Sequence, residues 1–197
     1  AQRIYDQARE RGLDALDAPV SGGNTGAANG TLAIMAGGDE AVFQKVLPVL
    51  ETMGENIVLE GGPGAGQHTK MANQIALSGV VASVCEAIAY GKKVGLDVDT
   101  MLASISAGAA GSWQMTNTAP RMLKKDYAPG FFIKHYIKDM NIATEEAEDV
   151  GLELPILNEV LRLYERMDAE GLGNLGTQAL IKEYEKDEIA ASMSELL

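Results

Sequence analysis

Along the N-terminal third of the chain, short apolar runs alternate with glycine-rich and polar segments, a pattern typical of mixed strands and helices. Residues 1–11 and 39–53 have a helical spacing of apolar positions and predict two helices. Residues 21–30 are rich in glycine and predict a loop. Buried strands are expected at 13–20, 31–38 and 56–61. Three strands are too few for a finished α/β domain.

Beyond this region the pattern becomes wholly helical. Helices are expected near 66–94, 98–107, 112–124, 132–151, 155–170 and 174–188. The first of them would span ~24 to 28 residues, or roughly 40 Å, and we expect it to belong to both parts of the molecule. The sequence therefore predicts an α/β segment over residues 1–62, followed by an all-α domain over residues 63–197.

Charge and composition argue against several classes of function. The net charge of −12 argues against a nucleic-acid surface, which needs a basic stripe. The most apolar stretch, 71–90, is interrupted by polar side chains and favours a packed helix over a membrane span. The single cysteine, Cys85, allows no internal disulfide, so we expect a cytoplasmic protein. Neither His68 nor His135 belongs to a metal-ligand pattern, and no metal site is predicted.

The segment "GGPGAGQHTKMANQ" (61–74) delivers a lysine to the start of a long apolar helix. The positive end of a helix disfavours the ammonium form of Lys70, which suits a lysine that transfers protons. The amides of Asn73 and Gln74 follow at i+3 and i+4, on the same face. Spacing alone does not choose between this role and a surface lysine after an ordinary loop. A phosphate cradle fits poorly, because the Gly-Lys-Ser/Thr ending of a Walker loop is absent.

Two further segments carry candidate chemistry. Ser21, Gly22 and Gly23 directly follow a predicted strand, and their hydroxyl and backbone N–H groups suit a carboxylate, although an ordinary connecting loop has the same composition. In "KHYIKDM" (134–140), Lys134 and Lys138 share one helix face, which by itself is more typical of a solvated surface.

These segments occur together in one family. "DAPVSGGNTGAANGTLAIMAGG", "GAGQHTKMANQ" and "PGFFIKHYIKDM" are similar, in order and spacing, to the substrate, catalytic and cofactor-side blocks of the β-hydroxyacid dehydrogenases. The chain thus resembles relatives of 3-hydroxyisobutyrate dehydrogenase, tartronate semialdehyde reductase and, more distantly, 6-phosphogluconate dehydrogenase. The resemblance implies the last part of a Rossmann-type nucleotide domain, followed by a helical domain like that of 6-phosphogluconate dehydrogenase.

The resemblance also implies roles for individual residues. Lys70 falls on the general acid/base. Ser21, Gly22 and Gly23 fall on the substrate-binding loop, and Asn73 and Gln74 fall where family members keep an amide near the substrate. Phe131 and Lys138 fall on residues that line the nicotinamide side. Some relatives carry Asn where this chain has Gln74, so the resemblance leaves open which amide contacts the substrate.

The implied activity is NAD(P)-dependent hydride transfer between a small β-hydroxy acid and its semialdehyde, in a homodimer or homotetramer. The family's G-x-G-x-x-G turn is absent from this sequence, so we expect about a hundred preceding residues to be missing and this chain alone to be inactive. The alternative is a non-catalytic helical module for dimerisation or binding. Measurable NAD(P) affinity with turnover would favour the enzyme. The sequence names neither the hydroxy acid nor the choice between NAD and NADP, and it predicts no nucleic-acid or membrane partner.

Overall fold

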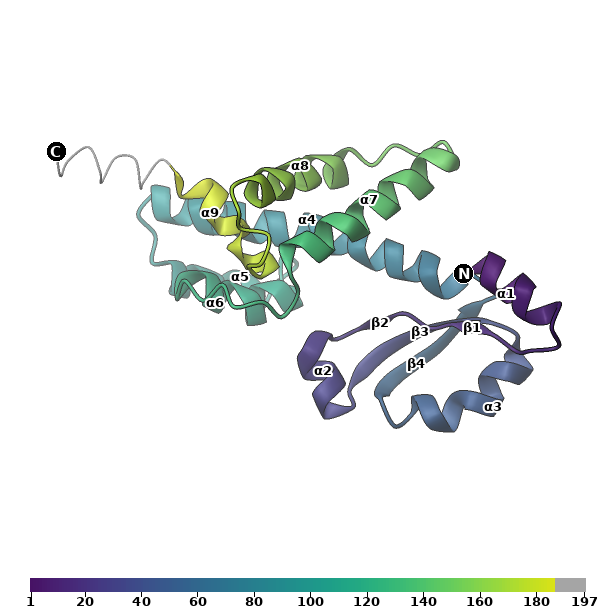
Figure 1. Cartoon of the computed structure of the whole chain (residues 1–197). Helices are drawn as coiled ribbons and strands as arrows, with labels where there is room; N and C mark the ends of the chain where they lie inside the picture. The colour runs from purple at the N-terminus through teal and green to yellow at the C-terminus, as the bar shows by residue number, and fades with distance from the viewer. Residues whose placement is uncertain (187–197) are drawn as a thin grey trace. The chain divides into compact units, whose positions relative to one another are not determined.

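The computed structural model describes residues 1–186, and the chain divides into two compact units, Ala1–Gln74 and a second that begins at Ile75 (Figure 1). The first unit is mixed α/β and the second is helical, as predicted from the pattern. The long helix α4 (Ala65–Lys93) begins in the first unit and continues into the second.

The sheet of the first unit is built around one central strand, β3 (Leu32–Gly38). β1 (Leu16–Asp17) and β2 (Val20–Ser21) both pair antiparallel with β3, and the Met35 N–H donates to the Pro19 carbonyl between them at 3.0 Å. They therefore form one predicted strand in two pieces, along one edge of β3. β4 (Gly54–Gly61) runs parallel to the other edge, so the three predicted strands are all present.

Helices α1 (Gln2–Arg9) and α3 (Glu40–Leu50) lie where the apolar spacing predicts them. The predicted loop at 21–30 is wrong over most of its length, because Gly23–Asn29 forms helix α2. This helix has no apolar periodicity to reveal it. It is held instead by close packing, since a Cβ on Gly26 would lie 3.1 Å from Leu32 Cδ2.

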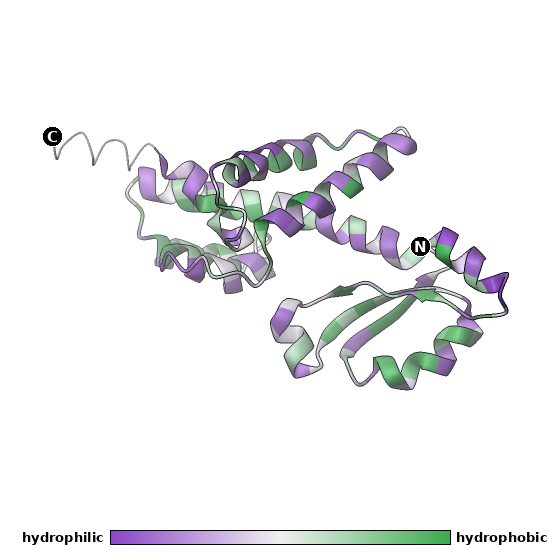
Figure 2. Cartoon of the chain, viewed as in Figure 1, coloured by the Kyte–Doolittle hydropathy of each residue, from purple (hydrophilic) through white to green (hydrophobic). Residues whose placement is uncertain are grey.

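The core of the first unit comes from β3 and α3. Its buried side chains are those of Leu32, Ile34, Ala36 and Phe43. Figure 2 shows hydrophobic residues on β3, β4 and α3, and β3 and α3 supply the buried side chains of this core.

The second unit is an assembly of helices around the middle of α4. Its other elements are α5 (Val98–Ser106), the π-helix η1 (Gln114–Thr118), α6 (Ala119–Leu123), α7 (Ile133–Asp149), α8 (Pro155–Ala169), the 3-10 helix η2 (Thr177–Leu180) and α9 (Ile181–Tyr184). The predicted helix at 112–124 is thus divided between a π-turn and a short α-helix. The predicted helix at 174–188 is replaced by η2 and α9 as far as the described residues reach; 187 and 188 lie outside them.

Helix α4 supplies the centre of this second core. Val81, Val84, Cys85 and Ile88 are buried on one side of it. Burial raises the pKa of the Cys85 thiol far above its usual range, which agrees with an inert core cysteine. By length and composition α4 is apolar enough to cross a membrane, but the core helix of a soluble protein meets the same criterion.

Candidate functional site

The start of α4 is fixed by a side chain from a distant strand. Asp17, the last residue of β1, accepts hydrogen bonds from the Gly64 N–H at 2.7 Å and the Gln67 N–H at 2.8 Å. The first N–H groups of a helix have no partner within it, and a Ser, Thr, Asp or Asn at the N-cap usually satisfies them. The segment "GGPGAGQ" contains none of these residues. Asp17 therefore caps the start of α4 from β1, because no residue of the preceding loop can do so.

The glycines around this carboxylate explain why the loop is so rich in glycine. A Cβ on Gly66 would lie 2.2 Å from the Met35 carbonyl oxygen and 2.8 Å from Asp17 Oδ2. A Cβ on Gly37 would lie 2.7 Å from both Asp17 Oδ1 and the Gly66 nitrogen. No side chain fits at either position without displacing backbone atoms or the carboxylate, so β1, β3 and α4 meet at van der Waals contact.

This arrangement argues against a phosphate-binding role for the glycine-rich loop. The Gly64 and Gln67 N–H groups, which a phosphate at the helix N-terminus would need, already bond to a carboxylate. The glycines of this loop serve the close packing of a helix on a sheet.

Lys70 lies three residues after Gln67, nearly one helical turn beyond the Asp17 contact. It is half-buried, as is Asn73, whereas Gln74 is fully buried. The Asn73 Nδ2–H donates to Gln74 Oε1 at 2.8 Å, so the two amides predicted from the sequence form one hydrogen-bonded pair. The Asn73 Oδ1 atom and the second N–H of this amide lie outside that bond.

Ser21 ends β2, and Gly22 and Gly23 lead into α2. Gly22 has φ of 129° and Gly23 has φ of 60°, conformations that residues with a Cβ rarely adopt. Ser21 follows Asp17 by four residues, which is at most about 13 Å of extended chain. Within the first unit, Asp17 thus lies close in the chain to the Ser21 loop and also bonds to the start of the helix that carries Lys70.

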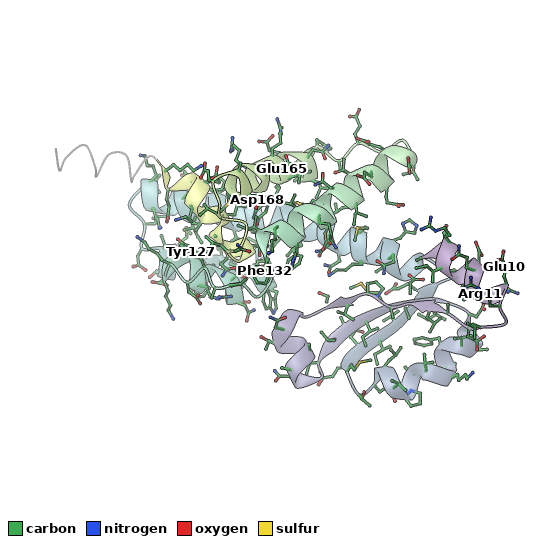
Figure 3. The ribbon with its side chains drawn as sticks, viewed as in Figure 1. Glu10, Arg11, Tyr127, Phe132, Glu165 and Asp168 are labelled. Atoms are coloured by element: carbon green, nitrogen blue, oxygen red, sulfur yellow. The ribbon has the colours of Figure 1, made fainter. Side chains whose placement is uncertain are left out.

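Phe131 and Lys138 belong to the second unit and differ in their surroundings. The Phe131 ring lies 5.4 Å from that of Tyr136, and its carbonyl accepts from the Thr177 N–H. Lys138 is two-thirds exposed, and its Nζ lies 2.8 Å from Oδ1 of the buried Asp139. Figure 3 marks Tyr127 and Phe132 in the segment that leads into α7, next to these positions in the chain.

Lys134, on the exposed face of α7, donates to Asn174 Oδ1 at 2.9 Å. Its partner thus differs from that of Lys138, which is Asp139. Sequence reasoning noted Asp139 only as the neighbour of Lys138. Asp139 is buried and lies beside the Lys138 ammonium group, so it belongs with the candidate residues around Lys138. Its position on the inner face of α7 is the sequence signal that could have identified it.

A hollow of about 360 Å³ lies in the first unit between α1 and residues 15–19. Asp17 and Gln67 are among its lining residues, whereas Lys70 and Ser21 are not. Because neither Lys70 nor Ser21 lines it, this hollow does not coincide with the predicted site.

Comparisons with known proteins agree with the sequence patterns. The family model described as the NAD-binding domain of NADP-dependent 3-hydroxyisobutyrate dehydrogenase matches residues 64–184. The model described as the NAD-binding domain of 6-phosphogluconate dehydrogenase matches residues 1–62. Both are NAD-binding families, in line with the expected NAD or NADP cofactor.

Individual relatives extend this result. An uncharacterized oxidoreductase of Bacillus subtilis, YkwC, is 52% identical over 92% of this chain and 63% of its own length. The 2-hydroxy-3-oxopropionate reductase of Escherichia coli is 41% identical over 93% of this chain and 63% of its own length. The structure of Mycobacterium tuberculosis 3-hydroxyisobutyrate dehydrogenase with L-serine is 30% identical and has a TM-score of 0.86, over 93% of this chain and 65% of that one.

The chain therefore spans less than two thirds of the length of these relatives. The match to the first family model alone covers more than half of the chain, and it includes the lysine helix and both second-unit candidates. On these grounds the chain belongs to the 3-hydroxyisobutyrate dehydrogenase family of NAD(P)-dependent oxidoreductases.

Proposed function

We propose that the full-length protein interconverts a small β-hydroxy acid and its semialdehyde by hydride transfer, with Lys70 as the general acid/base. The observation that carries this proposal is the placement of Lys70. It follows a helix start tied by Asp17 to the strand that leads into the Ser21 loop, in a chain of this family. The relative from Escherichia coli, a 2-hydroxy-3-oxopropionate reductase, supports the substrate class.

The proton chemistry follows from the position of one amine. In oxidation, neutral Lys70 accepts the hydroxyl proton as the hydride leaves the same carbon; in reduction, its ammonium form returns a proton to the developing alkoxide. The nicotinamide, when bound, supplies the hydride acceptor or donor. Asn73, paired with Gln74, offers an amide one turn from Lys70 to orient the reacting oxygen.

The substrate's carboxylate is assigned to Ser21, Gly22 and Gly23. The hydroxyl of Ser21 can donate to an anion, and the two glycines give a ligand close access to backbone N–H groups. Both glycines need positive φ, which supports a loop shaped for a specific approach. This assignment leaves the start of α4, whose N–H groups are taken by Asp17, free of any ligand role.

The cofactor's pyrophosphate does not fit the glycine-rich loop of this chain, because the Gly64 and Gln67 N–H groups are already bonded. Phe131 and Lys138 are the residues that we assign to the nicotinamide side. Phe131 offers an aromatic ring and Lys138 an exposed ammonium group.

The test is Lys70→Ala in the full-length protein. Loss of acid–base catalysis should lower kcat by about two to four orders of magnitude, with little change in stability. Lys93→Ala is the matched control, since Lys93 is an exposed lysine at the end of the same helix. Retention of more than half of kcat by the Lys70 variant would disprove the assignment of Lys70.

A further inference from the structure

Asp17 stands outside the residues assigned to substrate or cofactor, yet it makes the contacts that begin α4. Each of its carboxylate oxygens accepts one backbone N–H of that helix start, 47 and 50 residues away in the chain. The same oxygens lie where a side chain on Gly37 or Gly66 would have to be. The Asp17 carboxylate thus accepts two hydrogen bonds, and its position excludes a side chain at two glycines.

This contact affects the position of Lys70. Gln67 and Lys70 are three residues apart, so rotation or fraying of the first turn moves the lysine directly. No residue between 61 and 67 can replace the cap locally. A helix end without its cap frays within the first turn, which is the part that carries the amine.

We propose that Asp17 is a positioning residue that sets the place of Lys70 relative to the Ser21 loop. The inference rests on the proposed function, because it concerns the acid/base of that reaction. Asp17 is suited to this task since it joins both parts: it bonds to the helix before Lys70, and it precedes Ser21 on the same edge of the sheet.

A positioning role and a purely structural role predict different kinetics. A misplaced acid/base lowers kcat of the folded enzyme while the KM for NAD(P) stays unchanged. A cap that only stabilised the fold would lower the fraction of folded protein and leave kcat per folded enzyme unchanged.

Three variants of the full-length protein separate position from charge. Asp17→Asn removes the charge and puts a donor NH2 group against one backbone N–H. Asp17→Glu keeps the charge but adds a methylene where Gly37 and Gly66 leave no room. Asp14→Asn is the matched control, because Asp14 is an exposed aspartate of the same segment whose partner is Lys45.

For Asp17→Asn we expect kcat to fall about tenfold or more, the usual cost of a misplaced catalytic group, with the KM for NAD(P) unchanged. Asp17→Glu should also lose kcat, and Asp14→Asn should match the parent protein. Circular dichroism establishes that each variant is folded.

The outcomes distinguish this inference from the proposed function. If Lys70→Ala keeps its activity, both are overturned. If Lys70→Ala is inactive while folded Asp17→Asn and Asp17→Glu keep the parent's kcat, only the role of Asp17 is overturned. Should Asp17→Asn not fold, the Asp17→Glu variant decides: a normal kcat refutes the proposal, and a lowered kcat of the folded enzyme with an unchanged KM for NAD(P) supports it.

Discussion

The two units hold their candidate lysines in different ways. Lys70, in the first unit, is half-buried and follows a helix start fixed by a distant carboxylate and by glycines at contact distance. Lys138, in the second unit, lies within α7, is two-thirds exposed and pairs with the neighbouring Asp139. Backbone contacts at the start of α4 fix the position of Lys70, whereas Lys138 takes its position from an ordinary amphipathic helix. Precise placement suits a group that moves a proton, whereas an exposed cation suits recognition.

The largest effect should appear in cofactor affinity. Within this 197-residue chain, only the second unit carries residues assigned to the cofactor, and the Gly64 and Gln67 N–H groups at the start of α4 are already bonded to Asp17. Contacts at the nicotinamide end alone leave most of the cost of association unmet, so the Kd for NAD or NADP should be about 1 mM or weaker. Calorimetric titration of the purified chain measures it. Micromolar binding of either nucleotide would show that the described residues hold the pyrophosphate after all.

A second prediction concerns the close contact at the start of α4. In Gly66→Ala the new methyl group would lie 2.2 Å from the Met35 carbonyl oxygen, which forces the helix away from the sheet. The free energy of unfolding should fall by about 1–3 kcal/mol, the usual cost of overpacking. Urea denaturation monitored by circular dichroism is the measurement.

Two control variants test whether this loss of stability is specific to the close contact at Gly66. Gly62→Ala, in the same loop, meets no atom within 4 Å and should be neutral. Gly79→Ala, inside α4 but in the second unit, would meet only Ile156 at 3.6 Å and should gain up to about 1 kcal/mol from helix propensity. Equal losses in all three variants would remove the distinction between the two regions.

The parts of the molecule that follow a local pattern could be predicted from the sequence. The central strand β3 and the long helix α4 each contain an apolar run, and the family blocks identify Lys70 as a candidate. Helix α2 could not be predicted, because Gly23–Asn29 has no such period. The role of Asp17 was also hidden, since its partners lie 47 and 50 residues away and only the folded chain brings them together.

The same reasoning applies to the end of the second unit. The helical pattern predicted one helix near 174–188, whereas the chain makes a 3-10 turn at Thr177–Leu180. The buried Gln178 amide donates to the carbonyls of Asp126 and Ala128, and this tertiary contact fixes the tighter turn. Local periodicity carries no information about it.

A third prediction tests the substrate loop of the first unit. Gly22 has φ of 129°, and a Cβ there would lie 3.1 Å from Leu32 Cδ2. A β-branched residue at this position is strained by about 1–3 kcal/mol, so the backbone should relax and lose its approach to the carboxylate. For Gly22→Val we expect the KM of the hydroxy acid to rise about tenfold. The KM of the cofactor serves as the internal control, and an equal rise in both would contradict the assignment of this loop.

The smallest effect is expected in the second unit, at an exposed carboxylate. The hydrogen bond from the Arg121 side chain, aided by the Ala128 N–H, lowers the pKa of Asp126 below its usual value. A lowered pKa adds stability at pH values above the unfolded pKa of about 3.9, and this stability is lost as pH falls through the folded value. Asp126→Asn should therefore lower the urea midpoint slightly at pH 6, and the difference from the parent should vanish in acid, once the pH is below the folded pKa. A difference that persists in acid would mean that Asp126 acts through packing, and not through its charge.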